Sequence, residues 1–168
     1  MMRLRFFLAA VAALGFFHVA VDARADCAES PAPRVNWSRC LIDGRDLSDR
    51  DLSQARIAEA SFQRGILVKT NLSGVNGYRT KFISADLSGA VLDDASFIEA
   101  DFTKANLSDA SLKNADLRRA RFFQADLRNA DLSGARTMGA DLGTANLSGV
   151  LWTDGKRRCA EGSVGQCN

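Results

Sequence analysis

Large apolar residues recur at every fifth position over most of this chain. Of the 22 positions that run in steps of five from 47 to 152, 13 are Leu and 5 are Phe. The residue two places earlier is small, with Ala at 15 of the 22 positions from 45 to 150. Asp or Asn often lies between them, as in Ala85-Asp86-Leu87-Ser88-Gly89. The pattern defines a five-residue unit with a small first residue and a large apolar third residue.

A period of five fits neither an amphipathic helix, which repeats every 3.6 residues, nor a flat strand, which repeats every 2. On a helix, steps of five would rotate by about 140° and distribute the leucines around every side. We therefore expect the chain to turn a corner in each unit, with the first and third residues facing inward.

The phenylalanines indicate how many corners close one coil. Phe62, Phe82, Phe102 and Phe122 recur at intervals of 20 residues. Four units per coil would stack these rings directly above one another. The sequence therefore predicts a four-sided solenoid.

This pattern resembles the pentapeptide-repeat family, whose motif is Ala-(Asp/Asn)-Leu-x-x. The resemblance covers roughly Val35 to Thr153 and implies an all-β fold, a right-handed quadrilateral β-helix of about six coils. At a stacking distance of about 4.8 Å the column would be about 29 Å tall. Trp37 and Trp152 fall in the inward register at the two ends, where each could plug an open coil. The motif is broken at Arg45 and Arg50, at Gly77 and Thr137, and over the irregular stretch 65–80.

The first 25 residues have the features of a signal peptide. Arg3 and Arg5 precede an apolar stretch, and Ala23-Arg24-Ala25 has the small-x-small form of a cleavage site. We expect a signal peptide over 1–25, an N-terminal cap over 26–36, a repeat solenoid over 37–153 and a C-terminal tail over 154–168. The mature protein would be periplasmic or secreted, without a transmembrane helix, and an uncleaved N-terminal anchor is the alternative.

Cleavage after Ala25 would change the charge and the chemistry of the chain. Three basic residues and one acidic residue would leave, so the formal net charge would fall from +2 to 0. A neutral surface argues against nucleic-acid binding, which needs an excess of Lys and Arg. The only histidine, His18, would leave as well, and with it the usual catalytic base or zinc ligand. We expect no catalytic residue, no cofactor and no metal.

The four cysteines form two pairs that are close in sequence, Cys27 with Cys40 and Cys159 with Cys167. An even number of cysteines in an exported chain is typical of disulfides. The implied column separates its ends by far more than the Cα distance of about 4.4 to 6.8 Å that a disulfide allows. We therefore expect Cys27–Cys40 and Cys159–Cys167, one at each end.

A four-sided coil sorts the outward residues onto four faces, and the residue after each Leu or Phe is informative. It is mostly polar on two faces. On the other two it is often apolar, with Tyr78, Ile98 and Met138 on one and Ile83 and Phe123 on its neighbour. These five residues form a candidate interaction surface, because clustered exposed apolar side chains mark contact sites. Scattered surface apolar residues are the alternative explanation. Gly77 and Thr137 fall on the same face, which favours a special role for it.

A second candidate is a column of carboxylates and amides along one edge, comprising Asp46, Asp86, Asn106, Asp126 and Asn146. Such oxygens could hold a cation. They could instead accept hydrogen bonds from the backbone at each corner.

The leading functional hypothesis is a non-catalytic binding or scaffold protein of the cell envelope, which contacts a protein partner or itself. The first alternative is an enzyme acting on an envelope polysaccharide, with paired acids such as Asp93 and Asp94. The second is a DNA mimic that binds a topoisomerase, which export and zero net charge disfavour.

Overall fold

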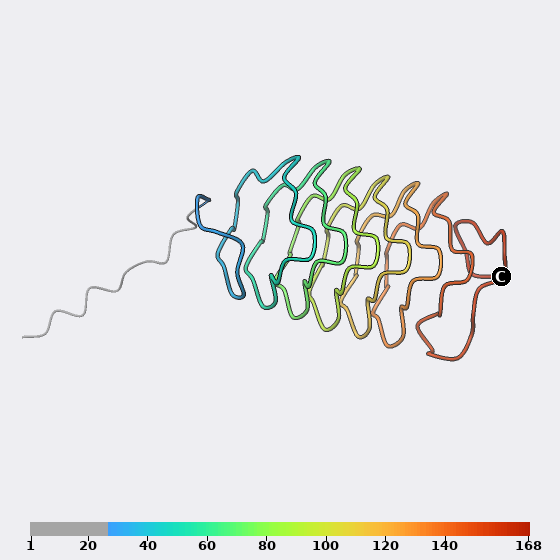
Figure 1. Ribbon diagram of the computed structural model, residues 1–168. Helices are drawn as coiled ribbons and strands as arrows, with labels where there is room; N and C mark the ends of the chain where they lie inside the picture. Colours follow the sequence, from blue (N-terminus) through green and yellow to red (C-terminus); the bar gives the residue numbers. More distant parts are fainter. Residues whose placement is uncertain (1–26) are drawn as a thin grey trace, which may run out of the picture.

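Residues 27–168 form a single column of stacked coils (Figure 1). The computed structural model describes these residues, and the signal peptide predicted over 1–25 lies outside them. In the described part of the chain no helix is long and apolar enough to cross a membrane. In place of extended strands, single parallel bridges join the second residue of each unit to the residue 20 positions later, from Asn36–Arg56 to Asp131–Leu151. This spacing gives four units per coil.

We name the four sides of the column by their first units. Side A carries 35–39 and every stretch 20 residues later; sides B, C and D begin with 40–44, 45–49 and 50–54. Sides A and C face each other across the column, as do sides B and D.

A tight turn at the end of each unit makes the corner. The N–H of the next unit's first residue donates to the carbonyl of the third residue, as from Ala90 to Leu87 at 3.0 Å. The fifth residue of every unit from Arg34 to Gly149 has a positive φ, as the second central residue of a type II turn requires. The third residue therefore points inward while the fourth and fifth lie outside the corner.

Regular backbone hydrogen bonds hold each coil to the next. The N–H groups of the third and fifth residues donate to the following coil, as Leu107 does to Asp126 and Asp109 to Arg128. The N–H of the second residue donates to the preceding coil, as from Asn106 to Ala85 at 2.9 Å. Each coil thus provides hydrogen-bond partners for the backbone N–H and carbonyl groups of its neighbours, and buried main-chain groups require such partners.

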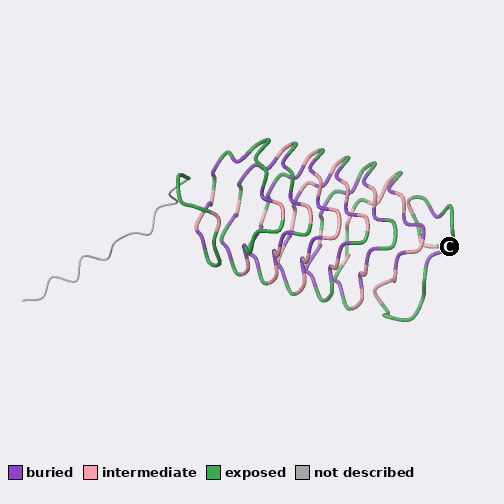
Figure 2. Cartoon of the chain, viewed as in Figure 1, coloured by how far each residue is buried: buried purple, intermediate pink, exposed green. Residues whose placement is uncertain are grey.

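The first and third residues of the units form one continuous hydrophobic core (Figure 2). The predicted phenylalanine stack is confirmed, with ring centroids 5.3 Å apart for Phe62–Phe82, 5.1 Å for Phe82–Phe102 and 5.0 Å for Phe102–Phe122. Phe97 enters from side A and meets Phe82 and Phe102 edge-on. Aromatic pairs favour both the stacked and the edge-on arrangement.

Packing and buried hydrogen bonds explain three of the irregular positions, Gly77, Thr70 and Thr80, and the special role expected of side A stays a prediction. A Cβ on Gly77 would lie 2.4 Å from the ring of Phe97, so the glycine makes room for the larger residue in the next coil. Thr70 and Thr80 replace inward alanines, and their buried hydroxyls donate to the carbonyls of Leu47 and Ile57. The 20-residue register continues without interruption through 65–80.

The two ends are closed differently. At the N-terminal end Cys27 is bonded to Cys40, and the guanidinium of Arg45 lies 5.4 Å from the centre of the fully buried Trp37 ring. Arg45 and Arg50, which break the motif, lie near this end, and both are exposed. At the other end Cys159 is bonded to Cys167. Trp152 is only partly buried there, so it plugs its end less completely than Trp37 does.

Candidate interaction surface

The five apolar residues singled out in the sequence lie at fourth positions, where each corner directs a side chain outward. Tyr78, Ile98 and Met138 lie in one column on side A, and Ile83 and Phe123 lie in one column on side B. Met138 is 74% exposed and Phe123 is 40% exposed, whereas the other three are half-buried. Each column is interrupted by a polar residue at the same position, Arg118 on side A and Thr103 on side B. The candidate interaction surface therefore consists of two broken columns.

A charged cluster lies on side A towards the C-terminal end of the column. The Arg118 guanidinium donates twice to the Asp116 carboxylate, at 2.8 and 2.7 Å, and Arg136 from the next coil donates to the same group at 2.5 Å. Hydrogen bonds from Arg118 outweigh the effect of burial and hold the pKa of Asp116 below its usual value of 3.8. Asp116 is 5% exposed, and it serves two guanidinium groups.

A ladder of alternating charge runs along the same corner at the fifth positions. Arg39 pairs with Glu59 at 3.1 Å, and Glu99 pairs with Arg79 at 2.8 Å and with Arg119 at 3.5 Å. The hydrogen bond from Arg79 lowers the pKa of Glu99. Sequence reasoning missed this ladder, although alternation of sign at a spacing of 20 residues could have revealed it.

A shallow depression opens between the two kinds of side chain. It has a volume of about 150 Å³ and is lined by Ile98, Arg118, Arg119 and Met138. Two of these residues belong to the apolar column and two to the charged cluster. The depression therefore offers an apolar contact beside guanidinium groups, a combination common at protein interfaces.

The column of carboxylates and amides on side C serves the backbone. Asp46, Asp86, Asn106, Asp126 and Asn146 each accept a hydrogen bond from the N–H two residues later, at 2.9 to 3.1 Å. Ile66 interrupts the column, and Arg128 pairs with Asp126. Within residues 27–168 no group of three or more His, Cys, Asp or Glu residues is placed to hold a metal ion. The corner hydrogen bonds explain these residues without a ligand.

The acids named for an enzymatic alternative join neighbouring coils. Asp93 accepts from the Ser111 hydroxyl at 2.6 Å and from the Lys113 N–H at 3.0 Å, and Asp94 accepts from the Asn114 amide at 3.2 Å. Both carboxylates are engaged with the coil above.

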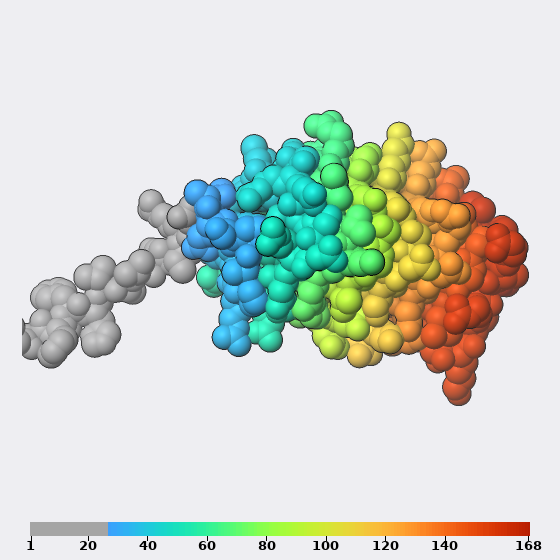
Figure 3. Space-filling model, viewed as in Figure 1, coloured from blue at the N-terminus to red at the C-terminus, as the bar shows by residue number. Residues whose placement is uncertain are grey.

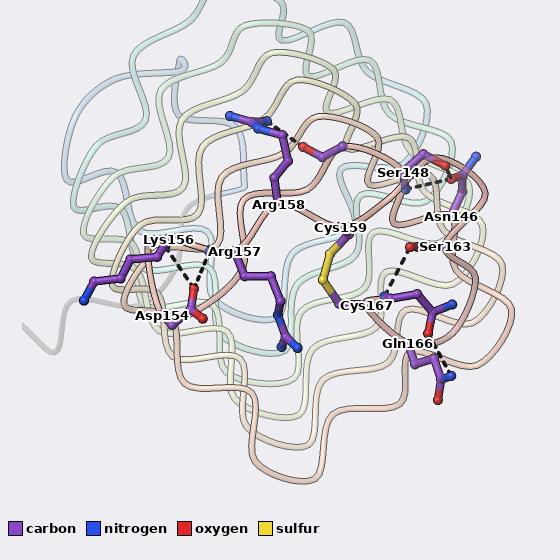
Figure 4. The surroundings of a disulfide bond; sticks show 12 residues. Asn146, Ser148, Asp154, Lys156, Arg157, Arg158, Cys159, Ser163, Gln166 and Cys167 are labelled. Atoms are coloured by element: carbon purple, nitrogen blue, oxygen red, sulfur yellow. Dashed lines mark hydrogen bonds between the residues drawn. A yellow bond between two sulfur atoms is a disulfide. The ribbon is translucent and has the colours of Figure 1, made fainter.

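The C-terminal tail folds back over the last coil (Figure 4). Asp154 accepts hydrogen bonds from the N–H groups of Lys156 and Arg157, and Arg158 donates to the Gly149 carbonyl. The basic run 156–158 therefore belongs to a turn that anchors the tail.

Comparison with known proteins identifies the repeat. The family model for pentapeptide repeats matches residues 55–94, 80–119, 100–136 and 115–151, which together cover 55–151, more than half of the 168 residues. The chain belongs to the pentapeptide repeat family. Members of this family fold as right-handed quadrilateral β-helices, and the predicted fold class is confirmed at that level.

Several solved pentapeptide repeat structures resemble the chain. A protein from the Arabidopsis thaliana thylakoid lumen is 26% identical, over 74% of this chain and 85% of that one, with a TM-score of 0.44. Rfr23 from the cyanobacterium Cyanothece 51142 is 20% identical, over 70% and 90%, with a TM-score of 0.45. QnrB1, a plasmid-mediated fluoroquinolone resistance protein, is 22% identical, over 71% and 63%, with a TM-score of 0.46. No curated protein sequence matches.

The pentapeptide repeat motif also reveals exposed apolar residues that sequence reasoning missed. Its second position is normally Asp or Asn, but here Leu41 is 81% exposed and Ile66 is 42% exposed. Searching second positions for apolar residues would have found both. They lie on sides B and C near the N-terminal end, away from Met138.

Proposed function

We propose that this protein is an exported, non-catalytic binding module of the cell envelope, a column of about six coils that holds another protein against sides A and B. The observation that carries the proposal is the pair of apolar columns at adjacent corners, which include the exposed Phe123 and Met138. Exposed aromatic and Met side chains are enriched where proteins bind one another.

The cysteines support a periplasmic or secreted location. Both pairs are disulfide-bonded, and residues 27–168 contain no free cysteine. Disulfides of this kind persist in oxidising compartments and are rare in the cytosol.

The two alternatives have weaker support. A polysaccharide-acting enzyme would need acids that are free to meet substrate, but Asp93 and Asp94 both accept hydrogen bonds from the adjacent coil. A DNA mimic would need a strongly acidic surface, whereas removal of 1–25 would leave equal numbers of acidic and basic residues.

Photo-crosslinking in the native cell tests the proposal. A photoreactive residue replaces Phe123, and a matched control replaces Lys113, which occupies the same unit position on the opposite side D. We expect capture of another protein from position 123, loss of that capture when Ile83 and Ile98 become Ser, and none from position 113. Capture of a second copy alone would indicate a structural oligomer. Equal capture at both positions, or no capture from 123, would contradict the proposal.

A further inference from the structure

The last coil has an open edge on two of its four sides. Between residues 37 and 152, third- and fifth-position N–H groups donate to another backbone carbonyl, with four exceptions: Thr137, Gly139, Leu142 and Thr144. The first-position carbonyls of Ala135 and Ala140 likewise accept no hydrogen bond, whereas Ala145 and Val150 on the next two sides do. The unpaired groups all lie on sides A and B.

The other two sides are covered by the tail. Antiparallel bridges join Asn146 to Val164 on side C and Leu151 to Arg158 on side D. Leu147 donates to Ser163 at 2.8 Å, and Gly165 donates back to Ala145 at 3.0 Å. The tail thus shows how a segment without the repeat can pair with the edge of the last coil. Gly165 is the last tail residue to bond to the coil, and a Cβ on it would lie 3.6 Å from the Thr144 nitrogen. Beyond it Cys167 is bonded back to Cys159, and no tail residue forms a backbone hydrogen bond with 135–142.

The exposure of the open stretch agrees with its missing partner. Inward positions in the middle of the column are buried, but Thr137, Ala140 and Leu142 are only partly buried. Met138 projects from the corner between the two sides, next to the depression formed with Ile98 and Arg118. Unpaired backbone beside exposed apolar side chains is the usual template for an added strand.

We propose that the open rung 135–142 binds an extended segment of another protein, which runs antiparallel to the rung as the tail does on sides C and D. This inference rests on the proposed function and specifies how the partner is held. The segment would accept hydrogen bonds from Thr137, Gly139 and Leu142 and would donate to Ala135 and Ala140.

The charges of the rung define the chemistry of the partner. The tail bridges to second-position residues, and on sides B and A these are Asp141 and Arg136. Arg136 shares Asp116 with Arg118, and Arg119 shares Glu99 with Arg79, so two carboxylates serve four guanidinium groups on this side. A carboxylate opposite Arg136 and a basic residue opposite Asp141 would complete the pairing.

The tail also sets the spacing. Its two bridged residues, Arg158 and Val164, are six positions apart. A segment antiparallel to the rung runs from side B to side A, so it meets Asp141 before Arg136. We therefore expect a basic residue in the segment, followed six positions later by an acidic one. A second copy of the protein fits poorly, because the tail of each copy adds a layer over sides C and D and would hold two columns apart.

The test uses random twelve-residue peptides displayed on phage, selected against the purified, oxidised full-length protein. We expect enrichment of peptides with a basic residue six positions before an acidic one. In hydrogen exchange, the amides of Thr137, Gly139 and Leu142 should exchange rapidly in the free protein and become protected by about tenfold or more when a selected peptide binds. R136D should weaken binding by about tenfold or more. R56D, at the same position on side A near the other end, should leave binding unchanged.

A charge swap keeps the inference falsifiable without loss of the fold. The double variant R136D/D141R, shown to be folded by its melting curve, should select peptides with the reverse order, acidic before basic. The inference is overturned if no peptide is enriched, if enriched peptides leave the three amides unprotected, or if those amides are already protected by self-association.

The two experiments distinguish failure of this inference from failure of the proposed function. Partner capture in cells through position 123, with no peptide binding at the rung, would keep the binding module and reject the open rung as its docking site. Absence of both would reject the two together.

Discussion

One residue at each corner adopts a left-handed backbone conformation, and among these Thr144 has the least suitable side chain. Of the 24 positive-φ residues from 34 to 149, 18 are not glycine, and Thr144, at φ 54°, is the β-branched one. A β-branched residue in this region is a genuine outlier, with a cost of about 1–2 kcal/mol. Of the other corner residues six are glycine, which has no Cβ to clash, and the rest are unbranched at Cβ.

Replacing Thr144 by Asn should stabilise the protein by about 1 kcal/mol, because Asn adopts the left-handed conformation more readily. The measurement is the free energy of unfolding from urea titration. The matched control is Gln124→Thr, one coil below in the same column, which should destabilise by a similar amount. A neutral or destabilising Thr144→Asn would show that the corner bears no such strain.

Asp116 is a buried carboxylate whose ionisation should affect stability. Because its pKa is lowered in the folded protein, its contribution is complete above the unfolded value near pH 4 and is lost as the pH falls through the lower folded value. Asp116→Asn should cost about 1 kcal/mol at pH 7, a modest figure because both arginines are partly exposed. The difference in unfolding free energy between wild type and variant should shrink as the pH falls below about 4. A difference that is constant with pH would assign the effect to shape and not to charge.

Neighbouring coils compensate for each other in the core. Gly77 leaves space at a third position and the ring of Phe97 fills it from the next coil. The core is thus packed across coils at this point, because the departure from the motif at Gly77 is matched by Phe97, 20 positions later.

A double-mutant cycle at Gly77 and Phe97 tests this compensation. Gly77→Leu should destabilise by about 1–3 kcal/mol through overpacking, and Phe97→Leu should cost a similar amount through the cavity it leaves. The double variant restores the regular motif at both positions and should recover most of the loss. Unfolding free energies give the coupling, and strictly additive losses would contradict the fit described here.

Residues 27–168 form a one-dimensional stack (Figure 3), and a different disulfide closes a cap at each end. In such a stack each coil contacts only its neighbours, so stability is approximately a sum of local terms. The disulfides lie at opposite ends, and each closes a short loop of 13 or 8 residues.

Removing Cys159–Cys167 by double Ser substitution should cost about 2–3 kcal/mol and free the tail. The amides of Leu147 and Gly149 donate to the tail, so their exchange should accelerate towards that of Thr137. Removing Cys27–Cys40 should leave these amides unchanged, and the two losses should add. Coupled losses would mean that the caps communicate through the column.

The sequence by itself determined the five-residue corner, the four-sided coil and the phenylalanine stack. Each of these follows from a local turn repeated with inward residues at fixed intervals, so periodicity is enough to find it. The two apolar columns also follow from the 20-residue spacing, and so could the charge ladder. The sharing of Asp116 by Arg118 and Arg136 and the filling of Gly77 by Phe97 required the coil above each residue to be in place. The open rung was decided only by the tertiary structure, because the tail has no repeat and its path over two sides depends on where it packs.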